Sequence, residues 1–181
     1  MTDDAQATSR PISPIPADDP NRQLTVADPD GGELRRVSIV GNNYTILVSG
    51  AQTAGRYCLI DMLVPDGGGP PPHRHDFEEM FTLLEGELEL TFRGQTAIVR
   101  AGSSVNIPAN APHAFKNKSG ALVHMLCLAS PAGLDEFFLE VGDPLASRTS
   151  PPPRLDQAQM EERMKEIKAL APKHRTELLA P

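Results

Sequence analysis

The sequence predicts an all-β fold, a sandwich or barrel of short strands, followed by one short helix and a second helix near the C-terminus. Short runs rich in Val, Ile, Leu and Phe fill residues 34–129, and turns containing Gly, Asn or Pro separate them. In residues 87–93 the side chains alternate between apolar and polar, which is typical of a strand with one buried face. These observations favour many short strands joined by tight turns.

The expected strands follow one another closely along the chain. Gly41-Asn42-Asn43 is a hairpin-like turn between the first two, and Glu85-Gly86 is a turn further on. The predicted strands span residues 34–40, 44–48, 56–64, 79–84, 87–93, 96–100, 104–107, 113–117 and 122–129.

Two helices are expected after the strands. Residues 133–141 have apolar side chains at helical spacing, and a proline-rich linker follows at 146–154. A second helix is predicted for residues 156–170, with Asp156 as the N-cap and Gln159 completing a capping box. Residues 177–179 could add one edge strand after that helix.

One face of the second helix has a narrow apolar stripe. We expect this stripe to pack on the outside of the barrel or on a neighbouring subunit, and we favour this over a role in binding a cofactor. Its members are Met160, Met164, Ile167 and Leu170.

The length of 181 residues suits one domain with tails. We expect residues 1–22 to form a disordered or extended N-terminal arm, because they are polar and rich in proline. Residues 23–145 are expected to form the barrel domain, and residues 146–181 the linker and the C-terminal amphipathic helix. Cys58 and Cys127 lie in apolar runs, so buried free thiols are expected rather than a disulfide.

The composition also limits the partners that we expect. A formal charge of −7 argues against a nucleic-acid partner, which would require a basic surface. No apolar run reaches the length of a membrane span, so no membrane partner is expected either. The N-terminus lacks the features of a secretory signal, and we therefore expect a cytoplasmic protein.

Candidate metal ligands gather in the stretch from Gly67 to Gly86. His73 and His75 are two residues apart, so on a strand both imidazoles lie on one face. Glu79 could join them by alternation or from the next strand, and His113, after a turn, would supply a third imidazole. Imidazole and carboxylate together suit a divalent first-row transition metal. A lone His-x-His pair is common on exposed strands, so the later His113 is what favours a site.

The spacing of these residues resembles the first motif of the cupin family, G-x5-H-x-H-x3/4-E-x6-G. Every specified position of that motif is matched here, by Gly67, His73, His75, Glu79 and Gly86.

A second stretch resembles the second cupin motif, G-x5-P-x-G-x2-H-x3-N, and begins fifteen residues after the first motif ends. Asn110 stands where the motif has its second glycine, and Asn tolerates the left-handed backbone that a glycine would adopt there. The other specified positions are matched by Gly102, Pro108, His113 and Asn117.

The resemblance covers residues 37–142 and implies a jelly-roll barrel, the double-stranded β-helix. It also implies one divalent transition metal ion, which could be iron, manganese, nickel, cobalt, copper or zinc, and a homodimer. Its implied ligands are His73, His75, Glu79 and His113.

Several neighbouring residues compete for a place in the site. Glu78 is the natural rival of Glu79, but the spacing to His75 and Gly86 favours Glu79. We expect solvated charges at Asp76 and Glu78, an Arg74 that points away from the metal, and a structural turn at Asn117. His124 is expected to be a hydrogen-bonded histidine of the barrel, and His174 a surface residue. Candidate pocket aromatics are Tyr57, Phe81, Phe92 and Phe115.

The sequence is similar to single-domain cupins of the quercetin dioxygenase type. This resemblance implies a metal-dependent dioxygenase that acts on a small aromatic or enolic, flavonol-like substrate, with Glu79 as the catalytic proton acceptor. The alternatives are a non-oxidative cupin that binds or senses a small molecule, and a metal-dependent isomerase or decarboxylase.

Overall fold

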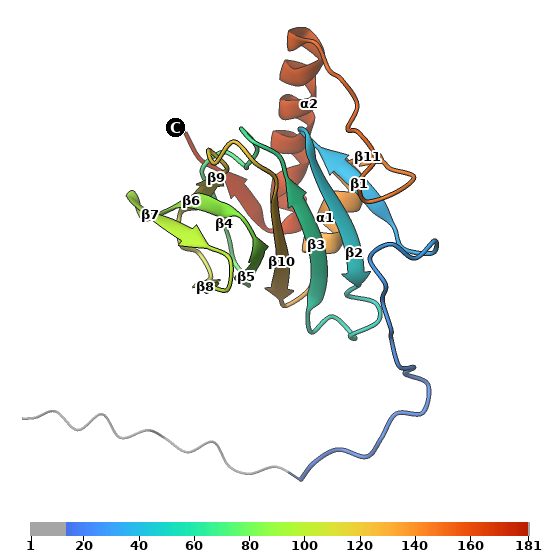
Figure 1. Ribbon diagram of the computed structural model, residues 1–181. Coiled ribbons are helices and arrows are strands. Elements are labelled where there is room, and N and C mark those ends of the chain that lie inside the picture. Colours follow the sequence, from blue (N-terminus) through green and yellow to red (C-terminus); the bar gives the residue numbers. More distant parts are fainter. Residues whose placement is uncertain (1–13, 181) are drawn as a thin grey trace, which may run out of the picture.

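The computed structural model describes residues 14–180 and consists of two antiparallel sheets and two helices, of which the first lies behind the larger sheet and the second stands at one end (Figure 1). The fold therefore confirms the predicted all-β jelly roll. The strands are β1 (Arg36–Ile39), β2 (Asn42–Val48), β3 (Cys58–Val64), β4 (His73–His75), β5 (Glu78–Glu85), β6 (Glu87–Phe92), β7 (Gln95–Arg100), β8 (Ser104–Ile107), β9 (His113–Lys116), β10 (Val123–Ser130), β11 (Asp143–Pro144) and β12 (Thr176–Leu178).

The two sheets take their strands from distant parts of the chain. The seven-stranded sheet has the order β11-β1-β2-β3-β10-β5-β8, and the five-stranded sheet has the order β12-β4-β9-β6-β7. The chain crosses from one sheet to the other between β3 and β4 and again between β4 and β5. Neighbouring segments of sequence therefore face each other across the barrel.

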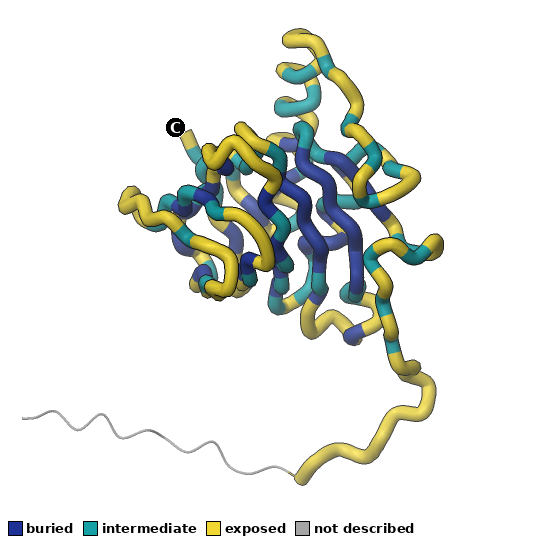
Figure 2. Tube along the Cα trace, viewed as in Figure 1, coloured by how far each residue is buried: buried dark blue, intermediate teal, exposed yellow. Residues whose placement is uncertain are grey.

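The core lies between the sheets, as the buried central strands in Figure 2 show. Strand β10 alternates strictly between buried and half-buried residues, as expected for a strand with one core face. Val123, Met125, Cys127 and Ala129 all have zero exposure, and they pack with Ile60 of β3. Fully burying an aliphatic side chain contributes about 1.5–3 kcal/mol, so this face is a major source of stability.

Two turn positions fix the backbone around the first motif and the second. Gly69 has φ of 131°, and a Cβ there would lie 2.1 Å from the carbonyl oxygen of Phe115, so only glycine fits. Asn110 has φ of 68°, which confirms the expected left-handed backbone where the motif has glycine. These turns bring β4 and β9 side by side.

The C-terminal part of the chain joins both sheets. Helix α1 (Leu134–Val141) packs on β1 and β3, and helix α2 (Gln157–Leu170) stands at one end of the sheets (Figure 1). Asp156 and Gln159 form the predicted capping box. After the short 3-10 helix η1 (Ala171–His174), the strand β12 pairs with β4 at the edge of the five-stranded sheet, so the predicted edge strand is confirmed.

The division into an arm, a barrel and a C-terminal segment stays a prediction. Most of the expected arm, residues 1–13, lies outside the described residues, as does residue 181. Within residues 14–180 no helix combines the length and the apolar character that crossing a bilayer requires.

We predict that neither cysteine reacts with thiol reagents in the folded protein. Both are free and have no exposed area. Burial, with the nearby Asp135 carboxylate, raises the pKa of the Cys58 thiol to about 11, and burial and Glu79 raise the pKa of Cys127. Since the thiolate is the nucleophile, labelling at pH 8 should be at least about a hundredfold slower than that of an ordinary thiol. Both should react in denaturant, and fast labelling of the native chain would contradict the prediction.

We predict that Asn117→Ala destabilises the fold by about 2–3 kcal/mol, because it leaves the buried carbonyl of Val64 without a partner. Asn117 has no exposed area, and its Nδ2 donates to the carbonyls of Val64 (2.9 Å) and Ala121 (2.7 Å). Asn106→Ala is the matched control, since Asn106 is exposed and its loss should change stability by less than about 0.5 kcal/mol. Urea unfolding with equal midpoints for the two variants would refute this role.

Candidate metal centre

The four predicted ligands meet between the two sheets. His73 and His75 lie on β4, and His113 lies opposite His73 on the paired strand β9 of the five-stranded sheet. Glu79 comes from β5 of the seven-stranded sheet. Alternation on β4 and β5 points His73, His75 and Glu79 into the barrel, so the fold brings together residues from both motifs.

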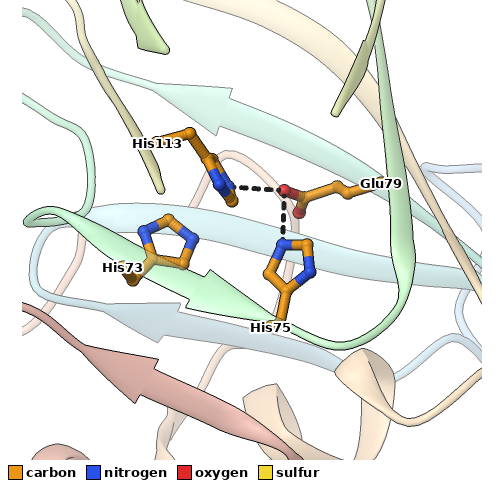
Figure 3. Close-up of side chains that lie close together, drawn as sticks. All are labelled: His73, His75, Glu79 and His113. Atoms are coloured by element: carbon orange, nitrogen blue, oxygen red, sulfur yellow. Dashed lines mark hydrogen bonds and ion pairs between the residues drawn. The ribbon is translucent and has the colours of Figure 1, made fainter. Parts of the chain in front are cut away.

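The separations between these side chains suit a single ion. One ligand atom from each residue lies within 4.8 Å of the others. The Nε2 atoms of His75 and His113 both lie 3.1 Å from Oε2 of Glu79 (Figure 3). Two atoms bound at about 2.1 Å to one ion lie about 3.0 Å apart when their bonds are perpendicular. These residues could therefore hold a metal, and their role as ligands stays a prediction.

The backbone fixes the tautomer of each histidine. Nδ1 of each ring lies 2.9 Å from a main-chain carbonyl, that of Pro71 for His73, Phe77 for His75 and Ala111 for His113. Because a carbonyl only accepts hydrogen bonds, Nδ1 must be the donor in each ring. In a neutral ring, Nε2 then has a lone pair and no proton.

With this tautomer, the centre of the site is stabilised by a positive charge. The lone pairs of His75 and His113 face an ionised carboxylate oxygen, which also accepts only. Two acceptors at hydrogen-bond distance repel each other unless a proton or a metal ion lies between them. The donor set of three imidazoles and one carboxylate thus fits a divalent transition metal.

The surroundings of the site shift the pKa values of its members. Burial would raise the pKa of Glu79, but hydrogen bonds from the protonated forms of His113 and His75 outweigh it and hold that pKa well below its usual range. Burial would lower the pKa of His113, but the contact with Glu79 raises it. Burial and the neighbouring His113 lower the pKa of His73 to about 4. His73 is therefore neutral at ordinary pH.

Two further side chains hold members of the cluster in place. The Phe77 ring stacks on the His75 ring, with 3.8 Å between centroids and 2° between planes. The thiol of Cys127 donates to Oε1 of Glu79 at 3.3 Å. The sequence did not reveal this contact, because Cys127 faces Glu79 only through the pairing of β10 with β5.

A mostly apolar cavity of about 110 Å³ borders His73, His75 and Glu79. Phe81 and Phe115 line it as predicted, whereas Phe92 and the partly exposed Tyr57 do not. The sequence around these aromatic residues could not show that β2, α1 and α2 would also line the cavity. The lining residues that the sequence did not predict include Asn42, Tyr44, Phe137, Phe138, Met164 and Ile167.

The residues that competed for the site lie outside it. Glu78 is exposed on the opposite face of β5, where it accepts hydrogen bonds from Asn106 and from the backbone N–H of Ala109. Arg74 points outward and pairs with Glu177, and Asp76 pairs with Arg175.

The two remaining predictions for histidines have different outcomes. His124 is hydrogen-bonded on the barrel as expected, with its Nε2 2.5 Å from Asp61. The expectation that His174 is a surface residue is wrong, because its side chain is 9% exposed, lies against Phe137 and pairs with Glu140. The 3-10 helix η1 turns this ring inward, which its position in a polar tail did not indicate.

Comparisons with known proteins agree with this architecture. Residues 60–129 match the family model described as Cupin domain, and this segment contains all four clustered residues. Quercetin 2,3-dioxygenase of Bacillus subtilis (strain 168) is 26% identical over 128 residues, which cover 70% of this chain and 37% of that enzyme. The HTH-type transcriptional regulator PuuR of Escherichia coli (strain K12) is 38% identical over 58 residues, which cover 32% of this chain and 31% of the regulator.

The chain thus spans only about a third of the length of these two curated relatives. Among solved structures, the polyketide cyclase RemF from Streptomyces resistomycificus superposes with a TM-score of 0.53 at 21% identity. That match covers 78% of this chain and 94% of the cyclase, and it shows a shared fold.

We predict that the purified protein binds about one transition metal ion per chain and that His75→Ala and His113→Ala lose it. Loss of an outer partner already weakens a metal site about 10- to 100-fold, and loss of a ligand should cost more. His124→Ala is the matched control, because His124 lies on the outer side of the barrel, paired with Asp61. Elemental analysis of the dialysed proteins measures the effect. Unchanged metal content in the two ligand variants would contradict the assignment.

Proposed function

Because the chain belongs to the cupins through the domain at residues 60–129, we propose that it is a metal-dependent dioxygenase acting on a small enolic or aromatic compound. The observation that carries this proposal is that three members of the four-residue cluster, His73, His75 and Glu79, line a mostly apolar cavity. A bound transition metal would supply Lewis acidity and a redox-active centre for the reaction of an electron-rich oxygen compound with dioxygen.

The four side chains leave room for a substrate beside them. Metals that prefer five or six ligands would keep one or two positions free after binding three imidazoles and one carboxylate. His73, His75 and Glu79 border the cavity, so these free positions would open toward it. The walls of the cavity are mostly apolar and suit the apolar part of a ligand. The part of the cavity beside His73, His75 and Glu79 suits an oxygen-bearing head group.

Glu79 is the proton acceptor in this proposal. Among the described residues that line the cavity it is the single carboxylate, so a substrate hydroxyl entering there meets no other anionic base. The buried Tyr44 cannot act as such a base, because burial raises the pKa of its hydroxyl and keeps the group protonated. Tyr44 can therefore donate a hydrogen bond to a substrate but cannot take its proton.

A non-oxidative binding or sensing protein is the second candidate. The observation that favours it is the 38% identity with a transcriptional regulator over 58 residues, which is higher than the identity with the dioxygenase. The same cluster and cavity would then hold a ligand without turning it over. An isomerase or decarboxylase would use the metal as a Lewis acid and would need no oxygen.

We predict that the metal-loaded protein consumes dioxygen with small enols and that Glu79→Gln lowers kcat/KM at least about a hundredfold, since a positioned proton acceptor is lost. Glu78→Gln is the matched control, because Glu78 is the adjacent exposed residue on the other face of β5. An oxygen electrode measures the rate, and elemental analysis shows how much metal each variant retains.

Three outcomes separate the candidates in this experiment. Oxygen uptake that is lost in Glu79→Gln and kept in Glu78→Gln supports the dioxygenase. Tight ligand retention with no product in air would replace it with the binding protein. Product formed equally under argon would replace it with an isomerase or decarboxylase.

A further inference from the structure

We propose that the C-terminal segment 157–178 is the roof of the metal-lined cavity and restricts the substrate to compact enolic compounds, excluding flavonol-sized ones. This inference rests on the function proposed above and names its substrate class. Met164 and Ile167 of α2 and Thr176 and Leu178 of β12 line the cavity. All four residues lie beyond the matched domain, which ends at residue 129.

The roof is joined directly to the strand that carries two of the clustered histidines. In the pairing of β12 with β4, Thr176 lies opposite His75 and Leu178 opposite His73. The red β12 arrow in Figure 1 therefore closes the same edge of the sheet that presents the site. Met164 and Ile167 belong to the apolar stripe that was expected to pack on the outside of the barrel or on a neighbouring subunit, and in the structure they line the cavity.

Ion pairs at both ends hold the roof in place. Glu177 and Arg175 of the C-terminal segment pair with Arg74 (2.6 Å) and Asp76 (2.7 Å), which flank His75. On α2, Arg163 pairs with Asp143 of β11 at 2.5 Å. Exposed pairs contribute little individually, but together with the strand pairing they define one position for the segment. The roof therefore has one fixed position over the cavity.

The cavity under this roof is too small for a flavonol. Its volume is about 110 Å³, whereas a cavity of about 150 Å³ is known to hold benzene and drug-sized ligands occupy about 300–1,000 Å³. A three-ring compound cannot enter unless the roof moves. Among compounds with an oxygen-bearing head, a short-chain enol or diketone comes nearest to this volume, and its alkyl groups would lie against the apolar side chains of Phe81, Phe115 and Met164.

The test compares two ligands with the same chelating head and different bulk, acetylacetone and dibenzoylmethane. Binding to the cobalt-loaded full chain under argon is followed by the visible absorption of the metal, so turnover is not needed. Additional apolar area by itself would favour the larger ligand. A preference of the wild type for acetylacetone therefore reports exclusion by the roof.

The variants Met164→Ala and Leu178→Ala each remove side-chain volume from the cavity wall. Each should raise the affinity for dibenzoylmethane relative to acetylacetone by about tenfold or more. Met160→Ala is the matched control on the same helix, because Met160 lines an outer groove and not the cavity, and it should leave the ratio unchanged. Met164→Trp fills the cavity and should abolish acetylacetone binding while metal content stays the same.

The roof assignment is overturned if the wild type binds both ligands equally well, or if Met164→Ala shifts the ratio no more than Met160→Ala. These results are independent of catalysis. A shifted ratio without any oxygen uptake would keep the roof and reject the dioxygenase. Oxygen uptake at equal rates with both ligands would keep the dioxygenase and reject the roof.

Discussion

Three hydrogen bonds from histidine rings to main-chain carbonyls determine what this site can do. Each bond uses Nδ1, so each ring presents Nε2 as its free nitrogen, and two of these nitrogens face the Glu79 carboxylate. The resulting cluster of acceptors is stable only with positive charge at its centre. The turns at Gly69 and Asn110, the stacking of Phe77 and the thiol of Cys127 all keep this arrangement in position.

Much of the fold and the cluster could be predicted because their signals are local. Alternation within single strands located most of the β-structure, and the spacing to His75 and Gly86 within the first motif selected Glu79 over Glu78. The capping box of α2 was readable for the same reason, since Asp156 and Gln159 are three residues apart.

What the sequence did not show depends on contacts between distant segments. Cys127 meets Glu79 through the register of two strands that are 48 residues apart along the chain. The apolar stripe of α2 did not show which surface it packs on, and the tertiary structure places two of its members, Met164 and Ile167, on the cavity. His174 was wrongly placed on the surface for the same reason, because η1 folds back onto α1.

Because β12 pairs with β4, the entry of a ligand under β12 and the geometry of the histidines on β4 affect each other. If a bulky molecule lifts the C-terminal strand, the hydrogen bonds that keep β4 straight are lost, and the imidazoles of His73 and His75 lose their common direction. Entry of an oversized ligand would thus disturb the cluster that could hold a metal ion, and the affinity for such an ion would depend on the position of the C-terminal strand.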